Sequence, residues 1–85
     1  MGKFQIKVIG LKGDENIIDL CHSEKKMQTM TVLDAKKKII TKLNIKVDIR
    51  MVFTTEPLEE SSQLQQYGIR HMSTIHVVAR MPGGI

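Results

Sequence analysis

Cysteine is almost absent from this sequence, since Cys21 is the only one among 85 residues. A single cysteine excludes an intramolecular disulfide, and it leaves no group of thiols spaced to hold zinc. Small domains without disulfides are typical of reducing compartments, so we expect the protein in the cytosol, in the nucleus or in both.

Aromatic residues are also scarce, with two phenylalanines, one tyrosine and no tryptophan. The core must therefore be built mainly from Ile, Leu, Val and Met. So few rings offer no stacking platform for nucleic acid, and a net charge of +4 supports only weak attraction to acidic surfaces. We therefore do not expect nucleic acid as a partner.

Long apolar runs are missing as well. The longest stretches, such as residues 75–79, are far too short to cross a bilayer, and no charged-then-apolar leader opens the chain. We therefore expect no membrane association. The length suits one domain with one small core, and we expect a monomer.

A hairpin is predicted at the start of the chain. Residues 3–9 alternate between apolar and polar side chains, which is the period of a half-buried strand. Gly13 supplies turn chemistry because glycine adopts a positive φ at little cost, and residues 18–21 then alternate again.

The period changes to that of a helix from Thr31 onward. Spacings of three and four place four apolar residues on one stripe, namely Val32, Ala35, Ile39 and Leu43. Thr31 is a predicted N-cap with Asp34 three residues later, and Asn44 is predicted to end the helix in the left-handed region. This predicts a helix over residues 31–43 with its lysines facing largely outward, namely Lys36, Lys37, Lys38 and Lys42.

The second half of the chain predicts further strands. Residues 49–53 alternate, Glu56-Pro57 predicts a turn, and Leu58 predicts a short edge strand before a polar loop. Residues 74–80 alternate most clearly of all. Together these elements predict an α+β fold with a mixed sheet of four to five strands, one main helix across it, and the first and last strands as parallel neighbours. We assign residues 1–80 to this domain and residues 81–85 to a flexible diglycine tail.

Two groups of motifs carry a family resemblance. The second half of the chain contains Leu58-Glu59-Glu60, Leu64, Tyr67, Ile69, Ser73-Thr74-Ile75-His76-Val77-Val78, Arg80 and Gly83-Gly84. The first half contains Phe4-Gln5-Ile6, Leu11-Lys12-Gly13, Thr31-Val32, Lys36 to Ile39 and Arg50 to Phe53. Through these residues the chain resembles the ubiquitin family over almost its whole length, nearly position for position in the second half. The stretch from Asp14 to Met30 matches poorly. The resemblance implies the β-grasp fold, and it implies a structural role for Tyr67, whose hydroxyl is expected to tie down a loop.

For the tail, the resemblance implies covalent attachment to other proteins. In ubiquitin-like modifiers an activating enzyme adenylates the terminal glycine, which passes through thioesters on conjugating and ligase enzymes to a lysine amine. Here Gly83 and Gly84 match the diglycine, and Gly84 would be the attachment residue. Ile85 lies beyond it, so a processing protease would first have to remove that residue.

The residues before the diglycine depart from the family pattern. Arg80 keeps the position that the activating enzyme of ubiquitin recognises, whereas Met81 and Pro82 differ, and Pro82 fixes φ and lacks a backbone donor. These three residues are therefore the predicted determinants of tail recognition, and a dedicated activating or processing pathway is one expectation.

An apolar patch is the second candidate site. Alternation sends Met51, Phe53, Val77 and Ala79 inward and leaves Val52 and Val78 facing solvent. Leu11 and His76 complete this grouping with Arg50 at its rim, which resembles the main recognition surface of ubiquitin. The predicted partners are ubiquitin-binding domains, with ordinary apolar surface as the alternative.

Lysines mark a further difference from the family. The two ubiquitin lysines most used for chain linkage correspond to Glu56 and His71. Lys36, Lys38 and Lys42 align with helix lysines of ubiquitin and are candidate acceptors, but a solvated helix face is the favoured interpretation of these lysines.

Nothing in the remaining sequence predicts catalysis. The histidines are scattered, Cys21 has no sequence neighbour that would activate it, and no serine lies in a nucleophile motif. We expect no enzyme activity, no cofactor and no metal. Two functions remain open: a conjugated modifier, or a ubiquitin-like interaction domain of a larger or tandem protein that binds partners through the patch without conjugation.

Overall fold

Apolar and polar side chains alternate along the predicted strands, and apolar side chains recur at helical spacing in the predicted helix. The segments with these patterns fold into the predicted strands and helix. The computed structural model of the chain describes residues 2–80, so Met1 and the predicted tail at residues 81–85 lie outside the described residues. The elements, in chain order, are β1 (Phe4–Ile9), β2 (Glu15–Cys21), α1 (Glu24–Thr29), α2 (Val32–Leu43), β3 (Ile49–Phe53), β4 (Glu56–Pro57), the 3-10 helix η1 (Leu64–Tyr67) and β5 (Thr74–Ala79).

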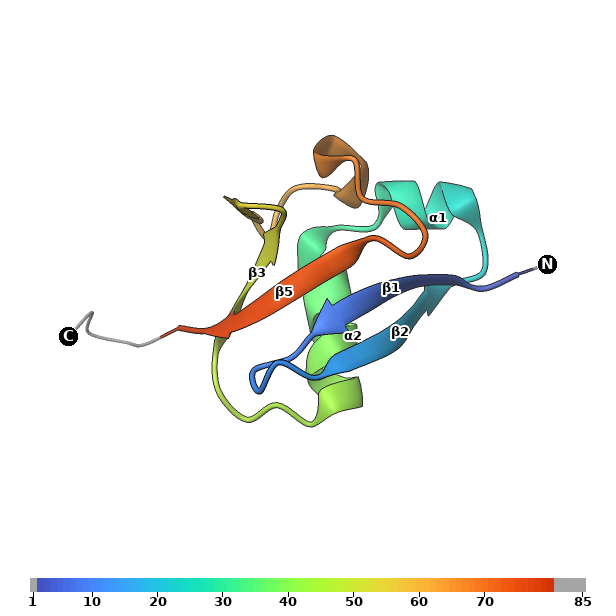
Figure 1. The fold of residues 1–85 in the computed structure, drawn as a ribbon. Coiled ribbons are helices and arrows are strands. Elements are labelled where there is room, and N and C mark those ends of the chain that lie inside the picture. Colours follow the sequence, from blue (N-terminus) through green and yellow to red (C-terminus); the bar gives the residue numbers. More distant parts are fainter. Residues whose placement is uncertain (1, 81–85) are drawn as a thin grey trace.

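The strands form one mixed sheet in the order β2-β1-β5-β3-β4 (Figure 1). β1 pairs antiparallel with β2, and β5 pairs antiparallel with β3. β1 and β5 are parallel neighbours at the centre, so the predicted pairing of the first and last strands is confirmed. The predicted α+β fold, with a mixed sheet of four to five strands and one main helix, is confirmed.

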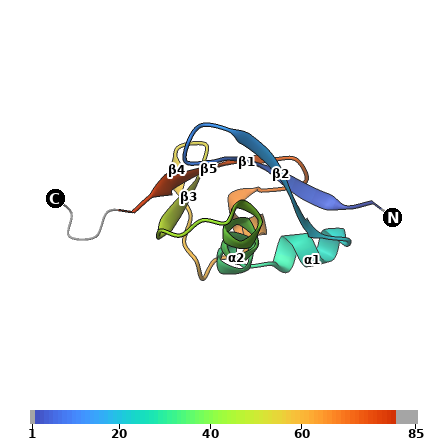
Figure 2. The ribbon, with the colours of Figure 1, turned by 90° about the horizontal axis from the view of Figure 1, so that it is seen from below.

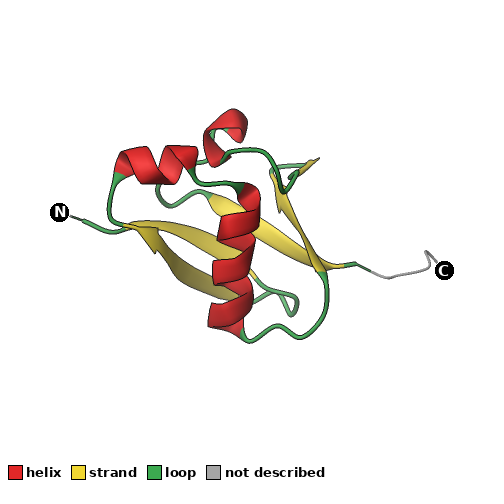
Figure 3. Ribbon diagram, turned by 180° about the vertical axis from the view of Figure 1, so that it is seen from behind, coloured by secondary structure: helices red, strands yellow, loops and turns green. Residues whose placement is uncertain are grey.

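Helices α1 and α2 lie on the same side of the sheet, and no helix among residues 2–80 covers the opposite face (Figures 2 and 3). α2 begins where predicted, because the Thr31 hydroxyl accepts a hydrogen bond from the Asp34 amide at 3.1 Å. It ends where predicted, with Asn44 in the left-handed region at φ 55°. Neither helix is long and apolar enough to span a bilayer, a finding that concerns only residues 2–80.

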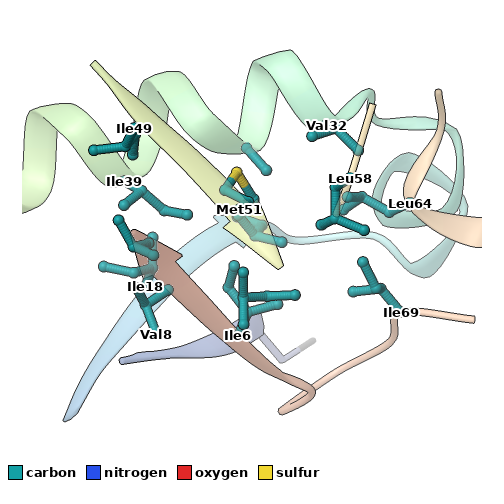
Figure 4. Packing of buried hydrophobic residues seen from close by; sticks show 14 of the residues in the cluster. Ile6, Val8, Ile18, Val32, Ile39, Ile49, Met51, Leu58, Leu64 and Ile69 are labelled. Carbon is teal, nitrogen blue, oxygen red and sulfur yellow. The ribbon is translucent and has the colours of Figure 1, made fainter. Parts of the chain in front are cut away.

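The core fills the space between α2 and the sheet (Figure 4). The α2 stripe contributes Val32, Ala35 and Ile39, all at most 1% exposed. Ile6 and Val8 of β1 and Ile75 of β5 face them from the sheet and are equally buried. Tyr67 has the predicted structural role, because its hydroxyl accepts a hydrogen bond from the Glu59 amide at 3.0 Å.

Two short helices were not predicted. α1 has six residues and buries only Met27, so its sequence contains too few apolar positions to show a period. Its one local signal is the N-cap, since the Ser23 hydroxyl accepts a hydrogen bond from the Lys26 amide at 3.3 Å. η1 is shorter still and buries only Leu64.

The turn before β4 differs from the prediction. Glu56-Pro57 is the edge strand itself rather than a turn, and it pairs with Val52 and Phe53 of β3. The turn lies at Thr54 and Thr55, where Thr54 adopts a left-handed φ of 58°. Threonine rarely adopts that conformation. Because neither glycine nor asparagine marks the turn, the sequence did not indicate its position.

Ala79 was expected to face inward, and it lies on the inward face, because it pairs with the buried Ile49 of β3. It is nevertheless exposed, since the end of β5 extends beyond the part of the sheet that α2 covers (Figure 2).

One orientation was predicted wrongly. Lys36 was expected to face solvent, but its side chain is only 11% exposed. Its ammonium lies 2.5 Å from Oε2 of Glu60 and 3.4 Å from Oδ1 of Asp48. The hydrogen bond to Glu60 is the main cause that raises the pKa of Lys36 above its usual 10.5, with partial burial acting in the opposite direction.

The core prediction concerns Ile39, which is fully buried on α2. We expect Ile39→Ala to lower the free energy of unfolding by about 2–5 kcal/mol, because it removes buried methylene groups and leaves a cavity. Urea denaturation followed by circular dichroism measures this loss. Lys38→Ala, on the exposed side of the same helix, is the matched control and should change stability by less than about 0.5 kcal/mol. Equal losses from both variants would contradict the assigned helix orientation.

Lys36→Met keeps an unbranched side chain that is one atom shorter than lysine and removes the charge of the ion pair. We expect a loss of about 1 kcal/mol near neutral pH, a small value because Asp48 and Glu60 remain roughly half exposed to water. Because the pKa of Lys36 is raised in the folded state, its ion pairs stabilise the protein fully when the pH is below the usual lysine pKa. This stabilisation is lost as the pH rises through the folded-state pKa. The difference between the two proteins should therefore shrink above a pH of 10.5. Urea denaturation across that range checks this, and a difference that grows with pH would contradict it.

Candidate functional site

The outer face of the sheet brings most of the predicted patch residues into register. Ile9 of β1 pairs with His76 of β5, and Val52 of β3 pairs with the same His76 from the other side. Side chains of paired residues point to the same face of a sheet. Ile9, His76 and Val52 therefore form one row across three strands, on the face opposite α2.

A second row lies one step further along β5. Val78 of β5 pairs with Arg50 of β3, so the guanidinium of Arg50 lies on the same face as the apolar row. Val78 is 45% exposed, whereas Val52 is only partly exposed and contributes less free apolar surface than predicted. The resulting surface, which we call the sheet patch, consists of Ile9, Arg50, Val52, His76 and Val78.

Ile9 is a patch residue that the prediction missed. It is partly buried, and it alternates with the fully buried Val8. The sequence indicates this position, because the alternation that sends Ile6 and Val8 inward sends Ile9 outward. The family resemblance indicates Leu11 and not Ile9.

Leu11 lies beside the two rows rather than within them. It belongs to the turn after β1, which is held by a hydrogen bond from the Gly10 amide to the Asp14 carbonyl at 2.8 Å and by Gly13 at φ 82°. Leu11 is 45% exposed and lines a hollow of about 400 Å³ together with Ile45 and Val47 of the α2–β3 loop. None of the five residues of the sheet patch lines this hollow.

The sheet patch suits docking rather than chemistry. Exposed aliphatic side chains with one cation at their edge can bury the apolar face of a partner helix and pair with its acidic residues. Within residues 2–80, no group of three histidine, cysteine or acidic side chains is arranged to hold a metal ion. Cys21 donates a hydrogen bond from its thiol to the Ser23 carbonyl, and His71 accepts one from the Gln5 amide, so both have structural partners.

The base of the tail lies at the end of β5. Arg80 donates its backbone N–H to the Asp48 carbonyl at 2.9 Å, and its Nε lies 3.8 Å from Oδ2 of the same Asp48. The other predicted tail residues, Met81, Pro82, Gly83 and Gly84, lie outside the described residues. Only the Arg80 part of the predicted tail-recognition site therefore has a described geometry.

The three candidate acceptor lysines differ in their surroundings. The ammonium of Lys36 is held between Asp48 and Glu60, so it would have to lose its proton and leave both carboxylates before it could attack as an amine. Lys38 and Lys42 are exposed on α2, and neither makes an ion pair within the described chain. The geometry therefore disfavours Lys36 as an acceptor relative to the other two.

Comparison with known proteins agrees with this architecture. The family model described as "Ubiquitin family" matches residues 6–82. Among solved structures, a designed protein based on ubiquitin superposes with a TM-score of 0.78 at 19% sequence identity, covering 99% of this chain and 96% of that one. At this identity the superposition shows a shared fold, while the family match extends over most of the sequence. The chain belongs to the ubiquitin family.

Proposed function

We propose that this protein is a ubiquitin-like modifier that is attached to other proteins through Gly84 after Ile85 has been removed. The observation that carries the proposal is the Gly83-Gly84 pair, which follows soon after the end of β5 in a chain of this family. Glycines suit this role because a backbone without side chains can enter the narrow channels of activating enzymes and proteases.

The chemistry belongs to the partner enzymes. A processing protease would hydrolyse the Gly84–Ile85 bond, and an activating enzyme would use ATP to form the Gly84 adenylate with release of pyrophosphate. The carboxyl group would then pass as a thioester to conjugating and ligase enzymes, and a lysine amine of the target would displace the thiol to form an isopeptide bond. The domain itself supplies recognition surfaces, and we place its action in the cytosol or nucleus.

We propose that the sheet patch is the surface that ubiquitin-binding domains contact. The exposed Val78 and the partly exposed Ile9 and Val52, on one face with Arg50 at the edge, support this role. A short amphipathic helix would bury its apolar side on Val78 and Ile9 and place acidic residues near Arg50.

The second candidate function is a ubiquitin-like interaction domain that binds partners without conjugation. The observation that favours it is the sheet patch itself, because docking there requires no tail chemistry. The two functions share the patch and differ only in the fate of Gly84.

The conjugation prediction is tested with tagged protein incubated with ATP in a cell lysate. We expect ATP-dependent covalent adducts, visible on denaturing gels, from the wild type and from a variant that ends at Gly84. Gly84→Ala should form few or none, because a side chain at the attachment residue obstructs the enzyme channels. Mass spectrometry of the adducts should find Gly84 joined to a lysine amine.

Equal adducts from the wild type and Gly84→Ala would contradict the modifier proposal. The absence of adducts from both the wild type and the shortened variant would also contradict it and favour the interaction domain. Adducts from the shortened variant alone would show that removal of Ile85 is the step missing from that lysate.

The patch prediction uses Val78→Asp. We expect about a tenfold or greater loss of affinity for an isolated ubiquitin-binding helical domain, because the charge would have to be desolvated at the centre of the interface. Isothermal titration measures this, and two-dimensional NMR spectra verify that the fold persists. Leu33→Asp is the matched control, since Leu33 is 37% exposed on α2, on the opposite side of the sheet. Unchanged binding by Val78→Asp would contradict the proposed role of the sheet patch. Ile9→Asp tests in the same way whether Ile9, the patch residue that was not predicted, contributes to binding.

A further inference from the structure

Asp48 lies between two cations that come from different parts of the chain. Its Oδ1 is 3.4 Å from the Lys36 ammonium of α2, and its Oδ2 is 3.8 Å from Nε of Arg80 at the end of β5. Its backbone carbonyl also accepts the Arg80 amide. Arg80 is therefore held by Asp48 through both its backbone and its side chain.

Both cations contact the single carboxylate of Asp48. Lys36 has a second and closer carboxylate in Glu60, at 2.5 Å, whereas Arg80 has only Asp48 among the described residues. Glu60 satisfies most of the charge of Lys36 and thereby leaves Asp48 available to Arg80. The strength of the ion pair between Arg80 and Asp48 therefore depends on how far Glu60 neutralises the charge of Lys36.

We propose that Asp48 is a positioning residue for the tail, which holds Arg80 and limits the access of other proteins to its guanidinium. The side chain of Arg80 is 50% exposed, so a protein that binds its guanidinium competes with Asp48 for it and does so best with a carboxylate of its own. Asp48 is thus a specificity determinant, because it favours partners that present an acidic group at the end of β5. Asp48 limits access to Arg80 in the same way whether or not the chain is conjugated.

Trypsin is a suitable probe, because it cleaves after arginine only when the guanidinium enters its own acidic pocket. Cleavage of the Arg80–Met81 bond in the full chain therefore reports how readily Asp48 releases Arg80, and mass spectrometry follows its rate. We expect Asp48→Asn to speed this cleavage about two- to fivefold, the range for an exposed ion pair. The difference should vanish at about 1 M salt, where the screening length falls to about 3 Å.

Lys36→Met provides a test of opposite sign. It leaves Asp48 to Arg80 alone, so cleavage after Arg80 should become slower than in the wild type, even though this variant is less stable overall. A purely structural role would predict faster cleavage from the loss of stability. Asp34→Asn, which removes an exposed carboxylate of α2 outside this cluster, is the matched control and should match the wild type.

The proposal is supported only if Asp48→Asn speeds and Lys36→Met slows cleavage after Arg80. It is overturned if either variant matches the wild type, or if Lys36→Met is cleaved faster. It is also overturned if cleavage at sites inside the folded domain rises in parallel in Asp48→Asn, since the effect would then be unfolding. None of these results depends on Gly84, so failure here is distinct from failure of the conjugation proposal.

Discussion

Burial of one face of the sheet beneath α2 is the constraint on which the other features depend. Ile39 and Ala35 of α2 are fully buried against the inward side chains of the central strands. Because side chains alternate along a strand, filling this core determines which residues remain on the other face. The sheet patch is therefore a consequence of core packing, and a register shift of one residue would exchange the two sets of side chains.

The end of β5 is held by charge rather than by apolar burial. Ala79 is exposed and α2 does not cover it, so packing contributes little there. The contacts of Asp48 and Glu60 with Lys36 and Arg80 join the helix, two loops and the last strand at this point. Such half-exposed pairs are individually weak.

Most of the fold could be predicted from the sequence, because the long elements have clear periods. The alternation in β1 and β5 and the apolar stripe of α2 place their residues correctly, and Thr31 and Asn44 mark the helix ends. α1 could not be predicted because Met27 is its only buried residue. The position of Lys36 could not be predicted either, since the carboxylates that hold it come from loops distant in sequence. Of the sheet patch, Ile9 was predictable from alternation alone, while the partial burial of Val52 required the structure.

Ion pairing differs between the lysines of the sheet and those of the main helix. On the sheet side, Lys3 and Lys7 are paired with Asp19 and Glu15. On the helix side, within residues 2–80, Lys38 and Lys42 have no such partner. These two lysines and the apolar rows of the sheet lie on opposite faces of the domain, so a contact made through one set would leave the other set open to solvent.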